Sequence, residues 1–195
     1  VVAAAPASSP GAGRTRALVA AFARVKKPAA GAVLSAADRA GNAQAFAAID
    51  AFFDRNSITS IPLAQHKDKL DAAQQKRFDE LFWGLIRLVA YPDSGAFFGR
   101  ASWRLKPATT KGDLTLVSLH AEIVADDIET DVTFHWRSIS GALRIVDVDF
   151  DGSSLLKDYG NQFGRIIAKA GAEGLLDKLQ KRLDQERANR KGLLP

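Results

Sequence analysis

Between residues 97 and 150, apolar and polar side chains alternate with a period of two, the pattern of β-strands that bury one face. Three runs rich in β-branched and aromatic residues stand out within this stretch: 114–124, 130–137 and 143–150. The turn-like segments between them, 125–129 and 138–141, are short enough to make consecutive runs antiparallel neighbours. The sequence therefore predicts a meander of antiparallel strands in the second half of the chain.

The run 130–137 shows the alternation most clearly. Val132, Phe134 and Trp136 fall on one face of it, and the residues between them, including His135, fall on the other. One face of the predicted sheet is therefore large and aromatic.

Helical spacing dominates the chain before and after this stretch. Helices are predicted over 14–25, from a capping box of Ser35 and Asp38 onward, and over 70–91. Pro92 to Gly95 are expected to end the third helix. After the strands, one helix starts at Ser153 or Ser154 and closes at Gly171, and a leucine-lined helix follows it.

This order predicts an α+β fold, a curved antiparallel sheet with helices packed on its concave face. We describe it as an NTF2-like core with a helical N-terminal part, an arrangement that can enclose a pocket.

Length and composition limit the number of domains and the class of protein. The chain has 195 residues, of which 47% are hydrophobic and 25% charged, values that suit one globular domain. Residues 1–13 are small residues, Pro and Gly, so we expect a disordered remnant beside a signal-peptide cleavage site, or a linker, and a single domain over 14–195. No stretch approaches the ~18 apolar residues of a membrane span, and we expect an exported, soluble protein.

The types of residue present exclude several functions. The absence of cysteine excludes disulfides and thiol catalysis, and the net charge of +5 is scattered with no nucleic-acid-binding motif. His66, His120 and His135 fall in no metal-binding or catalytic motif, no Ser stands in a nucleophile elbow, and no Gly-rich loop cradles phosphate. We therefore expect no cofactor, no metal and no enzymatic activity.

Two alternatives concern the acidic residues of the last strand. Asp147, Asp149, Asp151 and Asp158 nearly reproduce the spacing of a calcium-binding EF-hand loop, although a strand precedes them where that motif needs a helix. Asp147, flanked by Val146 and Val148, is also a candidate general base of an NTF2-like enzyme acting on a small apolar substrate. The sequence names no partner acid or oxyanion donor for it.

Residues 74–184 resemble the MlaC family, or toluene-tolerance auxiliary family, of periplasmic phospholipid-binding proteins. The resemblance is carried by Gln74, Arg77, Phe78, Phe82, Tyr91, Val146, Asp147, Val148, Gly152, Ser154, Tyr159, Gln162, Phe163, Gly171, Gly174, Leu175 and Leu179. Pro62 to His66 depart from the pattern, because the family usually has a Gly and a Trp before the long helix.

The resemblance implies a periplasmic carrier that moves phospholipid between an outer-membrane lipoprotein complex and an inner-membrane ABC transporter with an MCE-domain subunit, maintaining outer-membrane lipid asymmetry. On this reading 14–195 is a lipid-binding domain. The residues expected to line its cavity are Phe78, Phe82, Leu85, Val117, Leu119, Val132, Phe134, Trp136, Val146, Val148, Tyr159 and Phe163. The alternative is that the same side chains form a packed core without a cavity.

Overall fold

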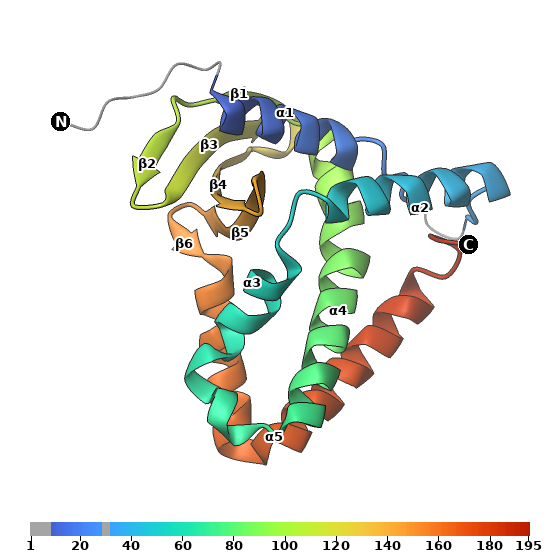
Figure 1. Ribbon diagram of the computed structural model, residues 1–195. Coiled ribbons are helices and arrows are strands. Elements are labelled where there is room, and N and C mark those ends of the chain that lie inside the picture. The colour runs from blue at the N-terminus through green and yellow to red at the C-terminus, as the bar shows by residue number, and fades with distance from the viewer. Residues whose placement is uncertain (1–8, 29–31) are drawn as a thin grey trace.

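The computed structural model of the chain describes residues 9–28 and 32–195 (Figure 1). The helices are α1 (Pro10–Phe22), α2 (Ala36–Asp50), α3 (Arg55–Ser60), α4 (Ala72–Phe98) and α5 (Leu155–Asn189), with 3-10 helices η1 (Ile61–Lys69) and η2 (Val124–Asp126). The strands are β1 (Ser102–Leu105), β2 (Thr109–Lys111), β3 (Leu114–Ile123), β4 (Ile128–Ile139), β5 (Ala142–Phe150) and β6 (Ser153–Ser154). The α+β class predicted from the sequence is confirmed.

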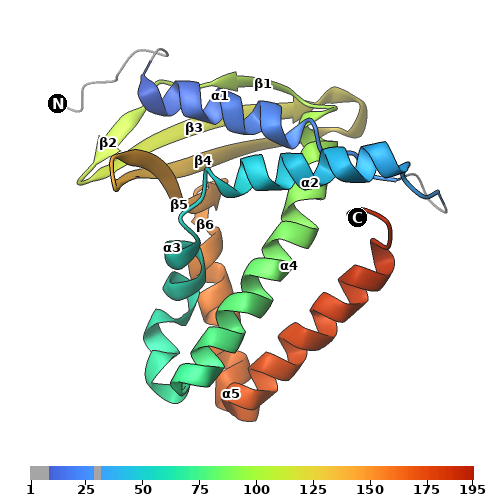
Figure 2. The same cartoon turned by 45° about the vertical axis from the view of Figure 1, so that its right-hand side comes forward.

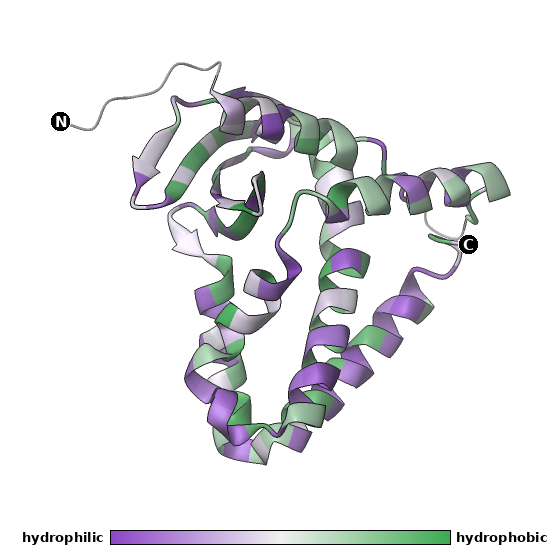
Figure 3. Cartoon of the chain, in the orientation of Figure 1, coloured by the Kyte–Doolittle hydropathy of each residue, from purple (hydrophilic) through white to green (hydrophobic). Residues whose placement is uncertain are grey.

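The three predicted strands are β3, β4 and β5, and they are antiparallel neighbours as expected. The sheet order is β1-β3-β4-β5-β6, with β2 paired beside β1 on β3. Ser140 and Gly141 both have positive φ (51° and 81°), the backbone of a tight hairpin turn, and they join β4 to β5. Alternating hydropathy is visible along β3 in Figure 3, and buried side chains alternate with more exposed ones along both β3 and β4.

Helices cover one face of the sheet and then extend away from it (Figures 1 and 2). The first hydrophobic core lies between that face and α1, α2 and the C-terminal part of α4, and its members include Leu18, Phe46 and Tyr91. The second core lies among η1, the N-terminal part of α4 and α5, and its members include Leu63 and Leu175. The molecule therefore has a sheet-and-helix half and an all-helical half.

Helix α1 begins at Pro10, four residues before the predicted start, so residues 10–13 do not belong to a disordered remnant. Ser9 caps the helix by accepting a hydrogen bond from the Ala12 amide (3.3 Å), and Pro10 suits the first turn, where no intrahelical N–H bond is needed. A Cβ on Gly11 would lie 3.0 Å from Val117 Cγ2, so the small residue lets this turn pack on β3. Residues 1–8 of the predicted remnant lie outside the described residues.

Helix α4 does not end at Pro92, contrary to the prediction. Pro92 lacks an N–H and removes one helical hydrogen bond, yet the helix continues to Phe98. The added turns pack against α1: Phe98 stacks on Phe22 with ring centroids 6.1 Å apart, and a Cβ on Gly95 would lie only 2.6 Å from the Phe22 carbonyl oxygen. Burial against α1 offsets the missing hydrogen bond.

The break expected at Gly171 is present. Gly171 has φ 70° and ψ −177° inside α5, and the chain reverses direction there (Figure 1). The second half of α5 is mostly hydrophilic with isolated apolar positions (Figure 3), and its Leu175, Leu176, Leu179 and Leu183 are buried in the second core. The two halves of α5 thus form the helical pair that the sequence predicted.

Candidate binding pocket

An apolar pocket of about 390 Å³ lies between the helix-covered face of the sheet and α4. This volume is inside the roughly 300–1,000 Å³ range of ligand pockets. Its walls are Phe22, Phe53, Ile58, Ile86, Ala90, Tyr91, Asp93, Ser94, Phe97, Phe98, Thr130, Val132, Phe134, Val148, Phe150, Leu155, Leu156 and Tyr159. Only a few of these side chains are polar, so the pocket suits a largely apolar ligand.

Strand pairing explains the floor of the pocket. Val132 lies opposite Phe150, and Phe134 lies opposite Val148, in the register of β4 and β5. Because side chains alternate across a strand, these four share one face and form an unbroken apolar surface.

Helix α4 supplies the opposite wall through residues three and four positions apart. Ile86, Ala90, Ser94 and Phe97 recur at this spacing, which places them on one side of the helix. The wall is therefore built from the part of α4 that flanks and follows Pro92, including turns absent from the predicted helix.

Four of the residues expected to line the cavity do so: Val132, Phe134, Val148 and Tyr159. Val117, Leu119 and Trp136 belong to the first core but do not line the pocket. Trp136 lies beneath α1, where its indole N–H donates to Thr15 Oγ1 (3.1 Å). Val146 is buried at the irregularity where β4 and β5 change register, and it too is outside the pocket.

The other four, Phe78, Phe82, Leu85 and Phe163, pack in the second core. Phe78, Phe82 and Phe163 form a compact aromatic cluster with centroid separations of 5.2–5.5 Å. At about 1.5 Å rise per residue, Phe82 lies roughly 12 Å along α4 from Ala90. One apolar stripe in the sequence thus serves two separate cores.

Sequence reasoning missed the aromatic residues at the ends of α1 and α4 and beside α3. Phe22, Phe53, Phe97 and Phe98 all line the pocket. The signal available in the sequence was the Phe97–Phe98 pair. Because the third helix was expected to end at Pro92, these two aromatic residues belonged to no predicted helix or strand.

The two tyrosines at the pocket remain neutral. Burial is the main cause that raises the pKa of the Tyr91 phenol, and the nearby Asp50 carboxylate raises it further. Tyr91 Oη donates to Asp50 Oδ1 (2.9 Å), which also accepts from Arg87 Nε (2.9 Å). Burial likewise raises the pKa of Tyr159. Neither phenol brings a charge to the pocket.

Asp93 is the charged residue of the pocket wall. Its carboxylate accepts two hydrogen bonds from Arg190 (3.2 and 3.1 Å) and one from Lys27 Nζ (2.9 Å). Burial alone would raise the pKa of Asp93, but the hydrogen bonds from these two cations outweigh it and lower the pKa below its usual value. Asp93 is therefore ionised and paired at neutral pH.

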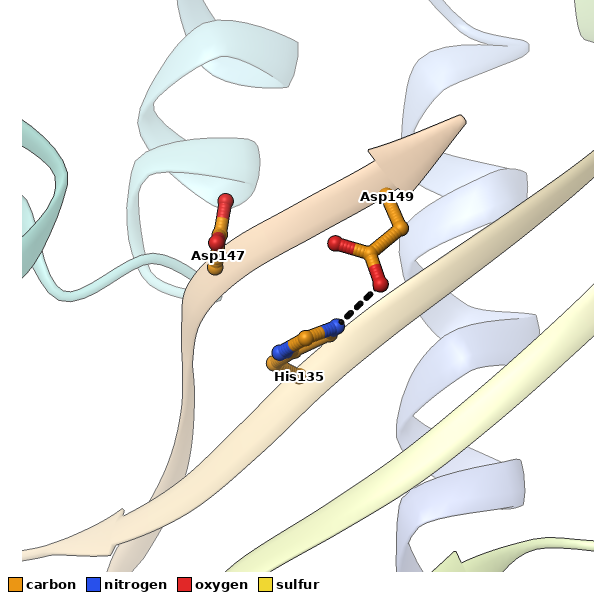
Figure 4. Close-up of side chains that lie close together, drawn as sticks. All are labelled: His135, Asp147 and Asp149. Carbon is orange, nitrogen blue, oxygen red and sulfur yellow. Dashed lines mark hydrogen bonds and ion pairs between the residues drawn. The ribbon is translucent and has the colours of Figure 1, made fainter. Parts of the chain in front are cut away.

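Asp147 does not point into the pocket, so the general-base hypothesis lacks its required geometry. It lies on the other face of β5 from Val148, beside His135 and Asp149 (Figure 4). Its Oδ2 accepts from Ser154 Oγ (2.6 Å), and its Oδ1 accepts from the amides of Val148 (2.8 Å) and Leu156 (3.4 Å). Asp147 thus holds the start of α5 against the end of β5.

The acidic residues of this segment do not form an EF-hand loop. Asp149 pairs with His135 Nε2 (2.9 Å) on the outer face of the sheet, as Figure 4 shows. Asp151 instead accepts from the Asp131 amide (2.8 Å), and Asp158 lies on α5. The spacing resembled a calcium loop, but a strand, a turn and a helix direct these carboxylates to different places.

Comparisons with known proteins bear on the chain as a whole. Within the part of the chain that the structure describes, no helix is both long and apolar enough to cross a membrane. A search of curated proteins found no match. Among solved structures, the chain is similar to a phospholipid-binding protein from Ralstonia solanacearum, solved in complex with a phospholipid. The two are 18% identical with a TM-score of 0.65, over 89% of this chain and 94% of that chain, a likeness of fold.

The family comparison covers most of the sequence. The model of the MlaC protein family matches residues 21–181, which include every described strand, the last two residues of α1, and α5 as far as Lys181. The resemblance noted between residues 74 and 184 therefore extends toward the N-terminus, and the chain belongs to the MlaC family.

Proposed function

We propose that this protein is a phospholipid-binding transport protein that holds an acyl chain in the pocket between β4, β5 and α4. The observation that carries the proposal is the apolar wall of that pocket, a volume of about 390 Å³. Membership of the MlaC family and the phospholipid bound by the Ralstonia solanacearum protein of similar fold support it.

The energetics of lipid transfer favour such a pocket. Burying a methylene is worth about 0.8 kcal/mol, so an acyl chain of sixteen carbons faces a cost on the order of 13 kcal/mol in water. Free diffusion of the lipid is negligible at that cost. A carrier must replace most of this burial, yet hold the lipid loosely enough to release it.

The finer part of the proposal concerns cellular role. We propose a periplasmic location, with residues 14–195 as a single lipid-binding domain that shuttles phospholipid between an outer-membrane lipoprotein complex and an inner-membrane ABC transporter carrying an MCE-domain subunit. Binding without catalysis is favoured because Asp147, the candidate base, serves the β5–α5 junction and lies away from the pocket.

The test is to purify the protein, extract it with organic solvent and identify copurified lipid by mass spectrometry. We expect phospholipid in stoichiometric amount. The stripped protein should also bind a fluorescent phospholipid, and that probe should be displaced by unlabelled lipid. Protein free of lipid that also fails to bind the probe would refute the proposal.

A further inference from the structure

A cluster of charged side chains, Lys27, Asp93 and Arg190, lies beside the apolar pocket, whose wall includes Asp93. Asp93 lines the pocket, and its side chain is 45% exposed, so it lies at the boundary with solvent. Lys27 comes from the segment after α1 and Arg190 from the end of α5, and both bind the Asp93 carboxylate. The fold thus brings three distant parts of the chain together at Asp93 of the pocket wall.

The charge of this cluster is not balanced. Arg190 is shared with Glu186 (3.0 Å), which also pairs with Arg182 (2.6 Å). The connected group contains three cations (Lys27, Arg182 and Arg190) and two anions (Asp93 and Glu186), so its net charge is +1. Arg182 is 59% exposed but pairs with Glu186. Lys27 lies against Asp93 of the pocket wall, its side chain is 50% exposed, and among the described residues it makes one ion pair, which leaves N–H donors free.

Two aliphatic hydroxyl groups, of Ser94 and Thr130, line the same pocket. Ser94 follows Asp93 on α4, and its side chain has no hydrogen-bond partner among the described residues. Thr130 Oγ1 makes only long contacts to the Asp151 carboxylate (3.3 and 3.4 Å). Ammonium and hydroxyl donors beside an apolar cavity form an arrangement that suits an anion attached to an apolar chain.

Resting on the proposed function, we infer that Lys27, held in place by Asp93, binds the phosphate of an anionic phospholipid head group, and that Ser94 donates a further hydrogen bond to it. The acyl chain then enters the pocket between α4 and the sheet. Lys27 is a specificity-determining residue in this arrangement. It favours lipids with a net charge of −1 over zwitterionic and uncharged lipids with the same tails.

The experiment measures displacement of a fluorescent phospholipid from the stripped, full-length protein by three competitors with identical tails: phosphatidylglycerol, phosphatidylethanolamine and diacylglycerol. For the unmodified protein we expect affinity to fall in that order. Lys27→Ala should weaken phosphatidylglycerol binding about fivefold, the scale of an exposed charge pair, and leave diacylglycerol binding unchanged. Lys27→Arg should restore most of the preference.

The neighbouring lysine provides a matched control. Lys26 pairs with Asp38 on α2, away from the pocket lining, and its side chain is 64% exposed. Lys26→Ala removes the same charge from the adjacent residue and should leave all three affinities unchanged.

The remaining outcomes overturn the inference in distinguishable ways. Equal losses for all three competitors in Lys27→Ala would mean that Lys27 supports the structure only, and equal effects of the two lysine variants would mean that net charge alone acts. Tight binding without any head-group preference would refute the inference but leave the proposed function standing. An unmodified protein that binds none of these lipids would refute the proposed function itself.

Discussion

Phe134 is the residue whose substitution best separates a ligand pocket from a packed core. It is 3% exposed and lines the pocket, so a Glu carboxylate there can turn toward the opening and keep part of its hydration. We expect Phe134→Glu to fold but to lose binding of a fluorescent phospholipid, as measured by titration alongside circular dichroism.

Phe82→Glu is the control for that experiment. Phe82 is 0% exposed and is enclosed by the aromatic rings of the second core, where a carboxylate finds no water and no partner. An unpaired buried charge costs several kcal/mol, so this variant should not fold. If Phe134→Glu unfolds just as completely, the residue belongs to a closed core and not to a pocket.

The Asp93 carboxylate makes the stability of the fold depend on pH. Its folded pKa is below the usual 3.8, so the carboxylate stabilises the fold above that value, and the contribution disappears as pH falls through the folded pKa. Asp93→Asn should therefore melt at a lower temperature than the unmodified protein at pH 7, and the difference should shrink below about pH 3.8. Thermal melts from pH 7 to pH 2.5 measure this, and a difference independent of pH would exclude the ion pairs as its cause.

At the scale of elements, the close approach of α4 to α1 can be tested with glycine. A Cβ at Gly95 would meet the Phe22 carbonyl oxygen at 2.6 Å, a backbone atom that cannot swing aside. Gly95→Ala should lower the free energy of unfolding by about 1–3 kcal/mol and weaken lipid binding, because the turns that wall the pocket must shift.

Gly41 is the matched position in α2. Nothing lies within 4 Å of a Cβ placed there, and the residue is exposed. Gly41→Ala should raise the free energy of unfolding by about 0.5–1 kcal/mol through helix propensity alone. Denaturant unfolding of both variants decides the question. A Gly95→Ala protein as stable as Gly41→Ala would mean that α4 does not pack on α1 as the structure has it.

For the whole molecule, an apolar ligand that binds only the folded state must raise its stability. At a lipid concentration one hundred times Kd, the gain is about 2.7 kcal/mol, which for a chain of this size corresponds to a rise in Tm of roughly 5–11 °C. Calorimetry of lipid-stripped protein before and after reloading should show this shift. Phe134→Glu should show no shift, and an unchanged Tm in the unmodified protein would contradict specific binding to the native state.

The local sequence pattern alone determined the main strands, the break in α5 and the family of this protein. Alternation along 114–150 specified three antiparallel strands and the inward direction of Val132, Phe134 and Trp136, because side-chain direction along a strand depends only on position. Gly171 marked the break in α5, because its positive φ is easily adopted only by glycine. The family, too, was recognisable from residues spread along the sequence.

The tertiary structure alone decided where the pocket lies. Local chemistry predicts that Pro92 ends α4, but packing against α1 outweighs one lost hydrogen bond and adds the turns that carry Phe97 and Phe98. A helical stripe does not reveal which of its turns face which partner, so Phe82 and Ala90 could not be assigned to different sites in advance. Lys27 and Arg190 lie 66 and 97 positions from Asp93, and only the folded chain, by bringing α1, α4 and α5 together, makes these side chains neighbours.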